Sequence, residues 1–216
     1  MKRITTALLL GLQSTTVTAG EIGALALEFN HHTLPLNDGS HLNVDGLGIR
    51  YSEITTLPLR LELVAARIGV RHDNDPTALG FQPDGYSAGL DLILASPRWH
   101  SLQIGADAGY RYYTANQQFD LQQMSIDWHQ TEARGWLALH IDQRATLYGC
   151  ANITHIRGSQ TVNSSSPTQR DFTNNQRNGY CAGLRVNLGD GGYIGFEAEQ
   201  RSRRGGTLYF GQYYDL

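Results

Sequence analysis

The chain has 216 residues, which is enough for one domain with a sizeable core. Its 20 acidic residues outnumber its 17 basic ones, and this acidic balance argues against a nucleic-acid partner. A mean hydropathy of −0.36 argues against a bundle of transmembrane helices, and 24 glycines beside 6 prolines are unlike the composition of a disordered tail.

The first residues have the pattern of an export signal. Lys2 and Arg3 precede a short apolar run over residues 7–12, and Val17 and Ala19 put small residues at −3 and −1 of a cleavage site. The run is too short for a membrane-spanning helix, which needs about 20 apolar residues. We therefore expect a signal peptide over 1–19 and an exported domain over 20–216, with an ordinary N-terminal amphipathic segment as the alternative.

From residue 22 onward, apolar and polar residues alternate in ten runs. This period of two is typical of strands with one apolar face, and a tilted strand needs about 9–11 residues to cross a bilayer. The runs cover 22–30, 43–54, 59–71, 85–95, 100–113, 126–141, 145–156, 178–188, 192–201 and 206–216.

The connections between these runs alternate in length. Short turns cover 55–58, 96–99, 142–144 and 189–191, whereas long polar connections cover 31–42, 72–84, 114–125 and 157–177. Only the last link, 202–205, is short where a long one is expected. Short turns at one end and longer loops at the other are the pattern of a transmembrane β-barrel.

The two faces of the runs differ in chemistry. One face is apolar, while the other carries charge that cannot face lipid, because an arginine at the bilayer midplane costs about 2–4 kcal/mol. We expect the charged face to form a network in the lumen, made of Arg50, Arg60, Glu62, Asp91, Asp107, Arg111, Glu132, Arg134, Arg185, Glu197 and Glu199. Aromatic residues at the ends of the runs are candidates for girdles at the membrane interfaces, namely Tyr51, Trp99, Tyr110, Tyr112, Trp128, Tyr180, Tyr193 and Tyr214.

Cys150 and Cys181 fall on the inward faces of neighbouring runs. Pairing them places Ala145 opposite Val186 and Arg157 near residue 172 or 174, in agreement with the limits of both runs. Export implies a compartment that permits disulfides. We therefore predict a cross-strand disulfide inside the barrel, with two reduced cysteines as the alternative, since such bridges are geometrically demanding.

On this architecture the chain resembles the small bacterial outer-membrane β-barrels and is similar in plan to the OmpA-type barrels, although the usual terminal phenylalanine is here Leu216. The ten runs predict an all-β, antiparallel up-and-down barrel of ten strands, or of eight if 22–30 or 126–141 proves irregular. The resemblance implies assembly into the bacterial outer membrane, with the terminal strand recognised by the barrel-assembly machinery. We expect a monomer without a cofactor.

Catalysis at the outer rim is an alternative. Asp73 and Asp75 lie in the second long connection, and Asp127 and His129 begin the sixth run. A carboxylate pair beside an Asp/His pair can activate a water molecule, with the histidine as general base. The arrangement resembles the rim of the omptin proteases, which are also ten-stranded barrels. A lipid A-acting hydrolase, using His155 with a serine at position 159, is a second version of this hypothesis.

Contact with lipopolysaccharide is also expected at the outer rim, because arginine forks suit phosphate groups. The candidates are Arg67, Arg71, Arg157, Arg201, Arg203 and Arg204. His31, His32 and His41 show no repeated ligand spacing, so we expect no metal site. The polar connection 157–177 has few apolar residues and is expected to be mobile and suited to surface contact.

The function that these observations favour is a non-enzymatic outer-membrane barrel with a structural, adhesive or surface-interaction role. Opposite charges inside a narrow barrel are expected to pair and plug it, because eight strands are just filled by side chains whereas 16–18 leave an aqueous channel. A small-solute pore and a rim hydrolase remain the alternatives.

Overall fold

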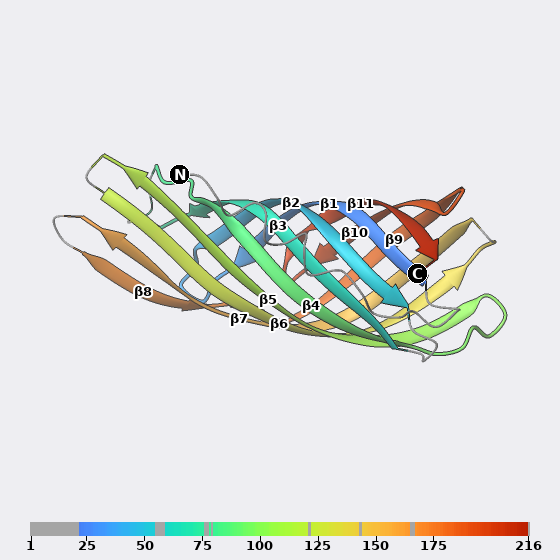
Figure 1. Cartoon of the computed structure of the whole chain (residues 1–216). Coiled ribbons are helices and arrows are strands. Elements are labelled where there is room, and N and C mark those ends of the chain that lie inside the picture. Colours follow the sequence, from blue (N-terminus) through green and yellow to red (C-terminus); the bar gives the residue numbers. More distant parts are fainter. Residues whose placement is uncertain are drawn as a thin grey trace.

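The structure, a computed structural model, describes residues 22–54, 59–75, 78, 80–120, 122–142, 144–164 and 167–215. It is a closed antiparallel barrel of ten strands, and β1 pairs with β11 to close it (Figure 1). The predicted barrel is confirmed, and the eight-stranded alternative is wrong. The barrel strands are β1 (Ile22–Pro35), β2 (His41–Ile54), β3 (Leu59–Asp73), β4 (Asp84–Ala95), β5 (Leu102–Phe119), β6 (Gln122–His140), β7 (Ala145–Asn163), β9 (Asn178–Gly189), β10 (Gly192–Gln200) and β11 (Arg204–Asp215).

The predicted export signal lies outside the described residues. No helix in the described part of the chain is long and apolar enough to cross a membrane.

The long connections are more ordered than the sequence indicates. β1, β5, β6 and β7 continue well past the predicted runs, so hairpins with short tips replace most of the expected loops. Within 157–177, β7 extends to Asn163 and an additional strand, β8 (Thr168–Thr173), pairs back onto it. The β5–β6 and β7–β8 hairpins project beyond the rest of the outer end (Figure 1). The short β10–β11 link is present as predicted.

The outer surface of the barrel carries the apolar faces of the strands. Leu90 and Leu92 of β4, Ile104 of β5 and Leu137 of β6 are exposed there, as the alternation predicts. A surface of this kind is stable only against lipid, since a soluble protein rarely exposes so continuous an apolar band.

Two of the predicted girdle residues are placed wrongly. Trp128 is 1% exposed and lies inside the barrel, and Tyr193 is 7% exposed and packs in the lumen against Tyr209 and Tyr213. In both regions the inward face of the strand is itself apolar or aromatic. The sequence therefore does not distinguish a ring that faces the lumen from one that faces lipid. The remaining girdle candidates lie on the outer face or at its turns.

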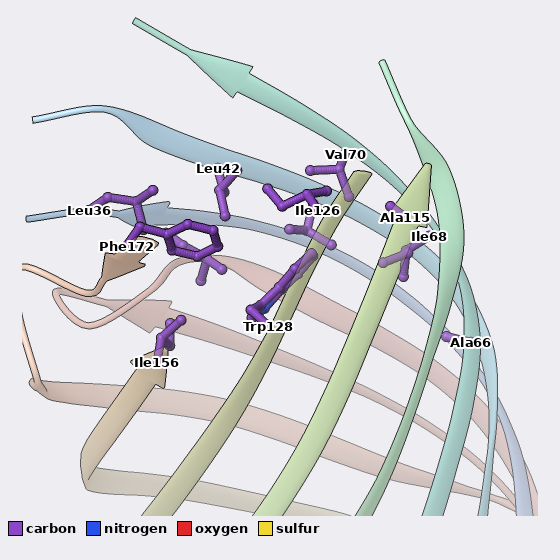
Figure 2. Close-up of a cluster of buried hydrophobic side chains, with 12 residues drawn as sticks. Leu36, Leu42, Ala66, Ile68, Val70, Ala115, Ile126, Trp128, Ile156 and Phe172 are labelled. Carbon is purple, nitrogen blue, oxygen red and sulfur yellow. The ribbon is translucent and has the colours of Figure 1, made fainter. Parts of the chain in front are cut away.

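The outer half of the lumen is filled by an apolar plug (Figure 2). Trp128 of β6 and Phe172 of β8 point into the barrel toward side chains from β1, β2, β3, β5 and β7, and the rings of Trp128 and Tyr113 stack 4.5 Å apart. The plug consists of Leu34, Leu36, Leu42, Val44, Ala66, Ile68, Val70, Ala115, Ile126, Trp128, Ile156 and Phe172. Phe172 belongs to this plug, and Val162 packs in a second buried cluster with Phe81 and Met124. The connection 157–177 is therefore packed, and the expectation that it has too few apolar residues to pack is wrong.

The predicted disulfide is present. Cys150 of β7 lies opposite Cys181 of β9, with the two Cα atoms 4.9 Å apart, and the two sulfurs are bonded. The register around the pair places Ala145 opposite Val186. Arg157 lies opposite Thr173 of β8, between the two positions expected.

Candidate functional site

Below the apolar plug, the lumen contains a network of buried ion pairs. Arg50 of β2 donates hydrogen bonds to Glu28 at 2.6 Å and to Glu62 at 3.0 Å. Glu62 also forms an ion pair with Arg60 and accepts a hydrogen bond from the Ser52 hydroxyl. Each buried charge is thereby matched by an opposite charge, which the low dielectric of the interior requires.

Glu28 belongs to this network, although it is not among the lumen residues predicted from the sequence. It is the only charge of β1 between Ile22 and Asn30, and it faces inward with Ala24 and Ala26. A single acid on the alternate face of an apolar strand was therefore the signal that could have found it.

Arg134 of β6 is the second centre of the network. Its guanidinium group contacts Asp107 at 2.8 Å, Glu197 at 3.2 Å and Glu132 at 3.8 Å. These acids come from β5, β10 and β6 itself, so one side chain ties several parts of the wall together across the lumen.

Arg111 and Asp91 form a further pair at 3.2 Å. Inward glycines make room for large rings between these charges: a Cβ on Gly105 would collide with Trp136, and one on Gly183 would collide with Tyr148.

The prediction that Arg203 lies at the outer surface and contacts lipopolysaccharide is wrong. Only 6% of its side chain is exposed, and it bonds Glu132 at 2.9 Å and also Glu199. The reason is the β10–β11 link, where Arg201 has a φ of 77° and Gly205 a φ of 153°. This tight link turns Ser202 and Arg203 into the lumen, and both neighbouring arginines remain exposed.

The network lines a cavity of about 650 Å³. The cavity extends from the β4–β5 turn, at Ser96 and Pro97, up to His32 and Arg203 below the apolar plug. Arg60 and Arg185 line its inner part. The lumen is therefore plugged at its outer half but hollow at its inner half, which composition alone does not reveal.

Above the apolar plug, polar side chains from three outer hairpins meet in a cluster that we call the outer latch, made of Asp38, Ser40, His72, Asp75, Gln160 and Arg170. Ser40 Oγ lies 2.7 Å from His72 Nε2, and His72 Nδ1 lies 2.6 Å from Gln160 Oε1. Arg170 bridges the carboxylates of Asp38, at 2.5 Å, and Asp75, at 3.4 Å.

Electrostatics stabilise the ionised form of Asp38 in this latch. Burial raises the pKa of Asp38, but hydrogen bonds from the Ser40 hydroxyl and backbone amide and the positive charge of Arg170 outweigh it and lower the pKa below 3.8.

Part of the latch has the connectivity of a nucleophile, a base and an orienting acid, since His72 Nδ1 also lies 3.3 Å from Asp75 Oδ2. The Ser40 hydroxyl, however, donates its proton to Asp38 Oδ1, which is 2.5 Å away. Ser40 is 2% exposed, and it does not line the lumen cavity. The arrangement therefore fits a structural tie between hairpins.

The residues proposed for a rim hydrolase are not brought together. Asp73 faces outward and pairs with Arg71 at 2.9 Å, whereas Asp75 is buried in the outer latch. Asp127 and His129 lie on the outer face of β6, where Asp127 accepts a hydrogen bond from the Tyr112 hydroxyl and His129 stacks on the ring of Tyr110.

The residues of the second hydrolase hypothesis are also apart: His155 and Ser159 lie on the outer face of β7, four residues and hence about 13 Å apart along the strand. Among the described residues no group of three His, Cys, Asp or Glu side chains is placed to hold a metal ion.

The other arginines selected for lipopolysaccharide contact are exposed on the outer face. Arg67 pairs loosely with Asp84 at 3.6 Å, and Arg71 pairs with Asp73. The guanidinium group of Arg201 lies over the ring of Tyr180, 5.7 Å from its centroid. Arg157 and Arg204 are also exposed.

No family model matches this chain, and no curated protein matches it. Among solved structures, the translocator domain of the autotransporter NalP from Neisseria meningitidis is similar to it, with 10% identity, 94% of this chain and 90% of that chain covered, and a TM-score of 0.50. The outer membrane protease OmpT from Escherichia coli has 9% identity, 94% and 99% coverage and a TM-score of 0.49. The attachment invasion locus protein Ail from Yersinia pestis has 13% identity, 92% and 100% coverage and a TM-score of 0.43.

Sequence identities this low show a shared fold and carry no information about activity. The closed ten-stranded wall and the apolar outer surface share their plan with the NalP translocator domain. The chain therefore has the fold of a small outer-membrane β-barrel.

Proposed function

We propose that this protein is a non-conducting outer-membrane barrel whose role lies at its outer surface. The observation that carries the proposal is the apolar plug, which crosses the lumen between the charged cavity and the outer latch. An ion that passed this layer would lose its water without gaining polar partners, and the cost of burying an unpaired charge is prohibitive. The packed layer supports a sealed barrel over the small-solute pore.

Conductance in planar bilayers tests the seal. We expect no steady current from the wild type and a measurable current from a Trp128→Ser, Phe172→Ser double variant, which makes the plug polar. Tyr86→Ser removes an exposed aromatic ring from the outer face and serves as the matched control, with no current expected. Steady, ion-selective steps from the wild type would refute the proposal.

The surface role that the geometry favours is contact with lipopolysaccharide phosphates. Arg67 lies beside Tyr86 in the β3–β4 register, and Arg201 covers Tyr180, so both cations lie next to aromatic rings at the outer edge of the apolar surface. Tyrosine prefers the level of the lipid headgroups, and arginine forks bind phosphate there. Arg204 is exposed on the adjoining strand β11.

Binding to vesicles that contain lipid A tests this contact. The variant Arg201→Gln, Arg204→Gln is expected to bind several-fold more weakly than the wild type, and the difference is expected to vanish with dephosphorylated lipid A. Arg98→Gln removes an exposed arginine from the β4–β5 turn, at the opposite end of the barrel, and is expected to behave as the wild type. Equal losses in both variants would argue for net charge alone.

A further inference from the structure

The inner part of the lumen cavity contains two arginines whose charges are incompletely matched. Arg60 has Glu62 as its ion-pair partner, but its Nε is buried without a hydrogen bond, and Glu62 is shared with Arg50 and Ser52. Arg185 lines the same cavity, and its side chain makes no hydrogen bond or ion pair with any residue that the structure describes.

The topology places these two arginines on opposite walls. Going round the barrel in either direction, four strands separate β3, which carries Arg60, from β9, which carries Arg185. Each lies toward the inner end of its strand. Two cationic forks therefore project into the cavity from both sides near its inner mouth.

We infer that the inner half of the lumen binds a small oxyanion, that is, a solute with a phosphoryl or carboxylate group. Guanidinium groups match the geometry of both groups through paired hydrogen bonds. A cavity of about 650 Å³ is within the size range of small-molecule sites. The solute enters from the inner mouth, because the apolar plug closes the outer side.

The surroundings of Arg185 suit such a solute. Tyr209, whose hydroxyl oxygen lies 3.5 Å from that of Tyr148, lines the same cavity and offers a neutral donor to an oxyanion. A partly buried guanidinium group without an acid partner carries a desolvation cost that a bound anion offsets. The site does not depend on contact with lipopolysaccharide, which concerns the outer surface.

Calorimetric titration of the refolded barrel in the uncharged detergent dodecyl maltoside tests the inference, with pyrophosphate and citrate as separate probes. We expect saturable binding of at least one probe. Arg185→Gln is expected to weaken it roughly tenfold or more, the effect of removing charge-assisted hydrogen bonds. Arg177→Gln removes an exposed arginine from the link between β8 and β9, is the matched control and is expected to bind as the wild type.

The outcomes separate clearly. Binding of pyrophosphate alone assigns phosphoryl recognition, and binding of citrate alone assigns carboxylate recognition; either supports the inference. Absence of saturable binding by the wild type overturns it, as does equal binding by Arg185→Gln. If Arg185→Gln does not fold, as judged by its circular dichroism, Arg60→Gln decides the question by the same criteria.

Discussion

Replacing Arg203 by glutamine probes the charge network at a residue that the sequence predicts at the outer rim but that lies in the lumen. The side chains of Arg203, Glu132 and Glu199 are 6%, 12% and 3% exposed, so the substitution leaves two carboxylates close together without their shared cation. Breaking a buried pair on one side costs about 3–5 kcal/mol. We expect the free energy of unfolding of Arg203→Gln to fall by that amount.

The neighbouring residue supplies the control. Arg204 is exposed, and substitutions at such positions change stability by about 0.5 kcal/mol or less. Urea unfolding of the barrel in lipid vesicles, followed by tryptophan fluorescence, measures both variants, and the midpoint shifts by the energy change divided by the denaturant slope.

A double variant sharpens the assignment to the ion pair. Adding Glu199→Gln to Arg203→Gln removes one of the two carboxylates that have lost their cation, so part of the lost free energy of unfolding is expected to return. Equal stability of Arg203→Gln and Arg204→Gln, or simple additivity in the double variant, would refute the reasoning.

Three further predictions concern the disulfide and the outer latch. Reduction of Cys150–Cys181, which closes a separation of 31 residues, is expected to lower the free energy of unfolding by up to about 4 kcal/mol; an unchanged urea midpoint in reductant would contradict this. Folding lowers the pKa of Asp38, so its carboxylate stabilises the fold at pH values above 3.8, and this contribution declines as the pH falls through the lowered pKa. Asp38→Asn is therefore expected to destabilise the barrel at pH 7 and to do so by less at pH 3. A difference that persists unchanged at pH 3 would count against the latch. Ser40 is expected to resist labelling by a fluorophosphonate, because it is buried and its hydroxyl donates to Asp38; labelling that disappears in Ser40→Ala would instead show a reactive nucleophile.

Much of the lumen could be predicted because a strand of period two has only two faces. Once Leu90 and Leu92 face lipid, Asp91 must face inward, and the same reasoning places Cys150 and Cys181 on one interior register. The sequence therefore determined the barrel, the membrane-facing surface, the disulfide and most members of the charge network.

The tertiary structure alone decided which elements meet across the lumen. Alternation cannot tell that Trp128 joins Phe172 inside the barrel, because the outer half of the interior is apolar and offers no contrast with the lipid face. The alternation of inward and outward residues also does not place Arg203, because the tight β10–β11 link breaks the period of two. The outer latch and the opposed Arg60 and Arg185 depend on contacts between strands far apart in the chain, which only closure of the barrel brings together.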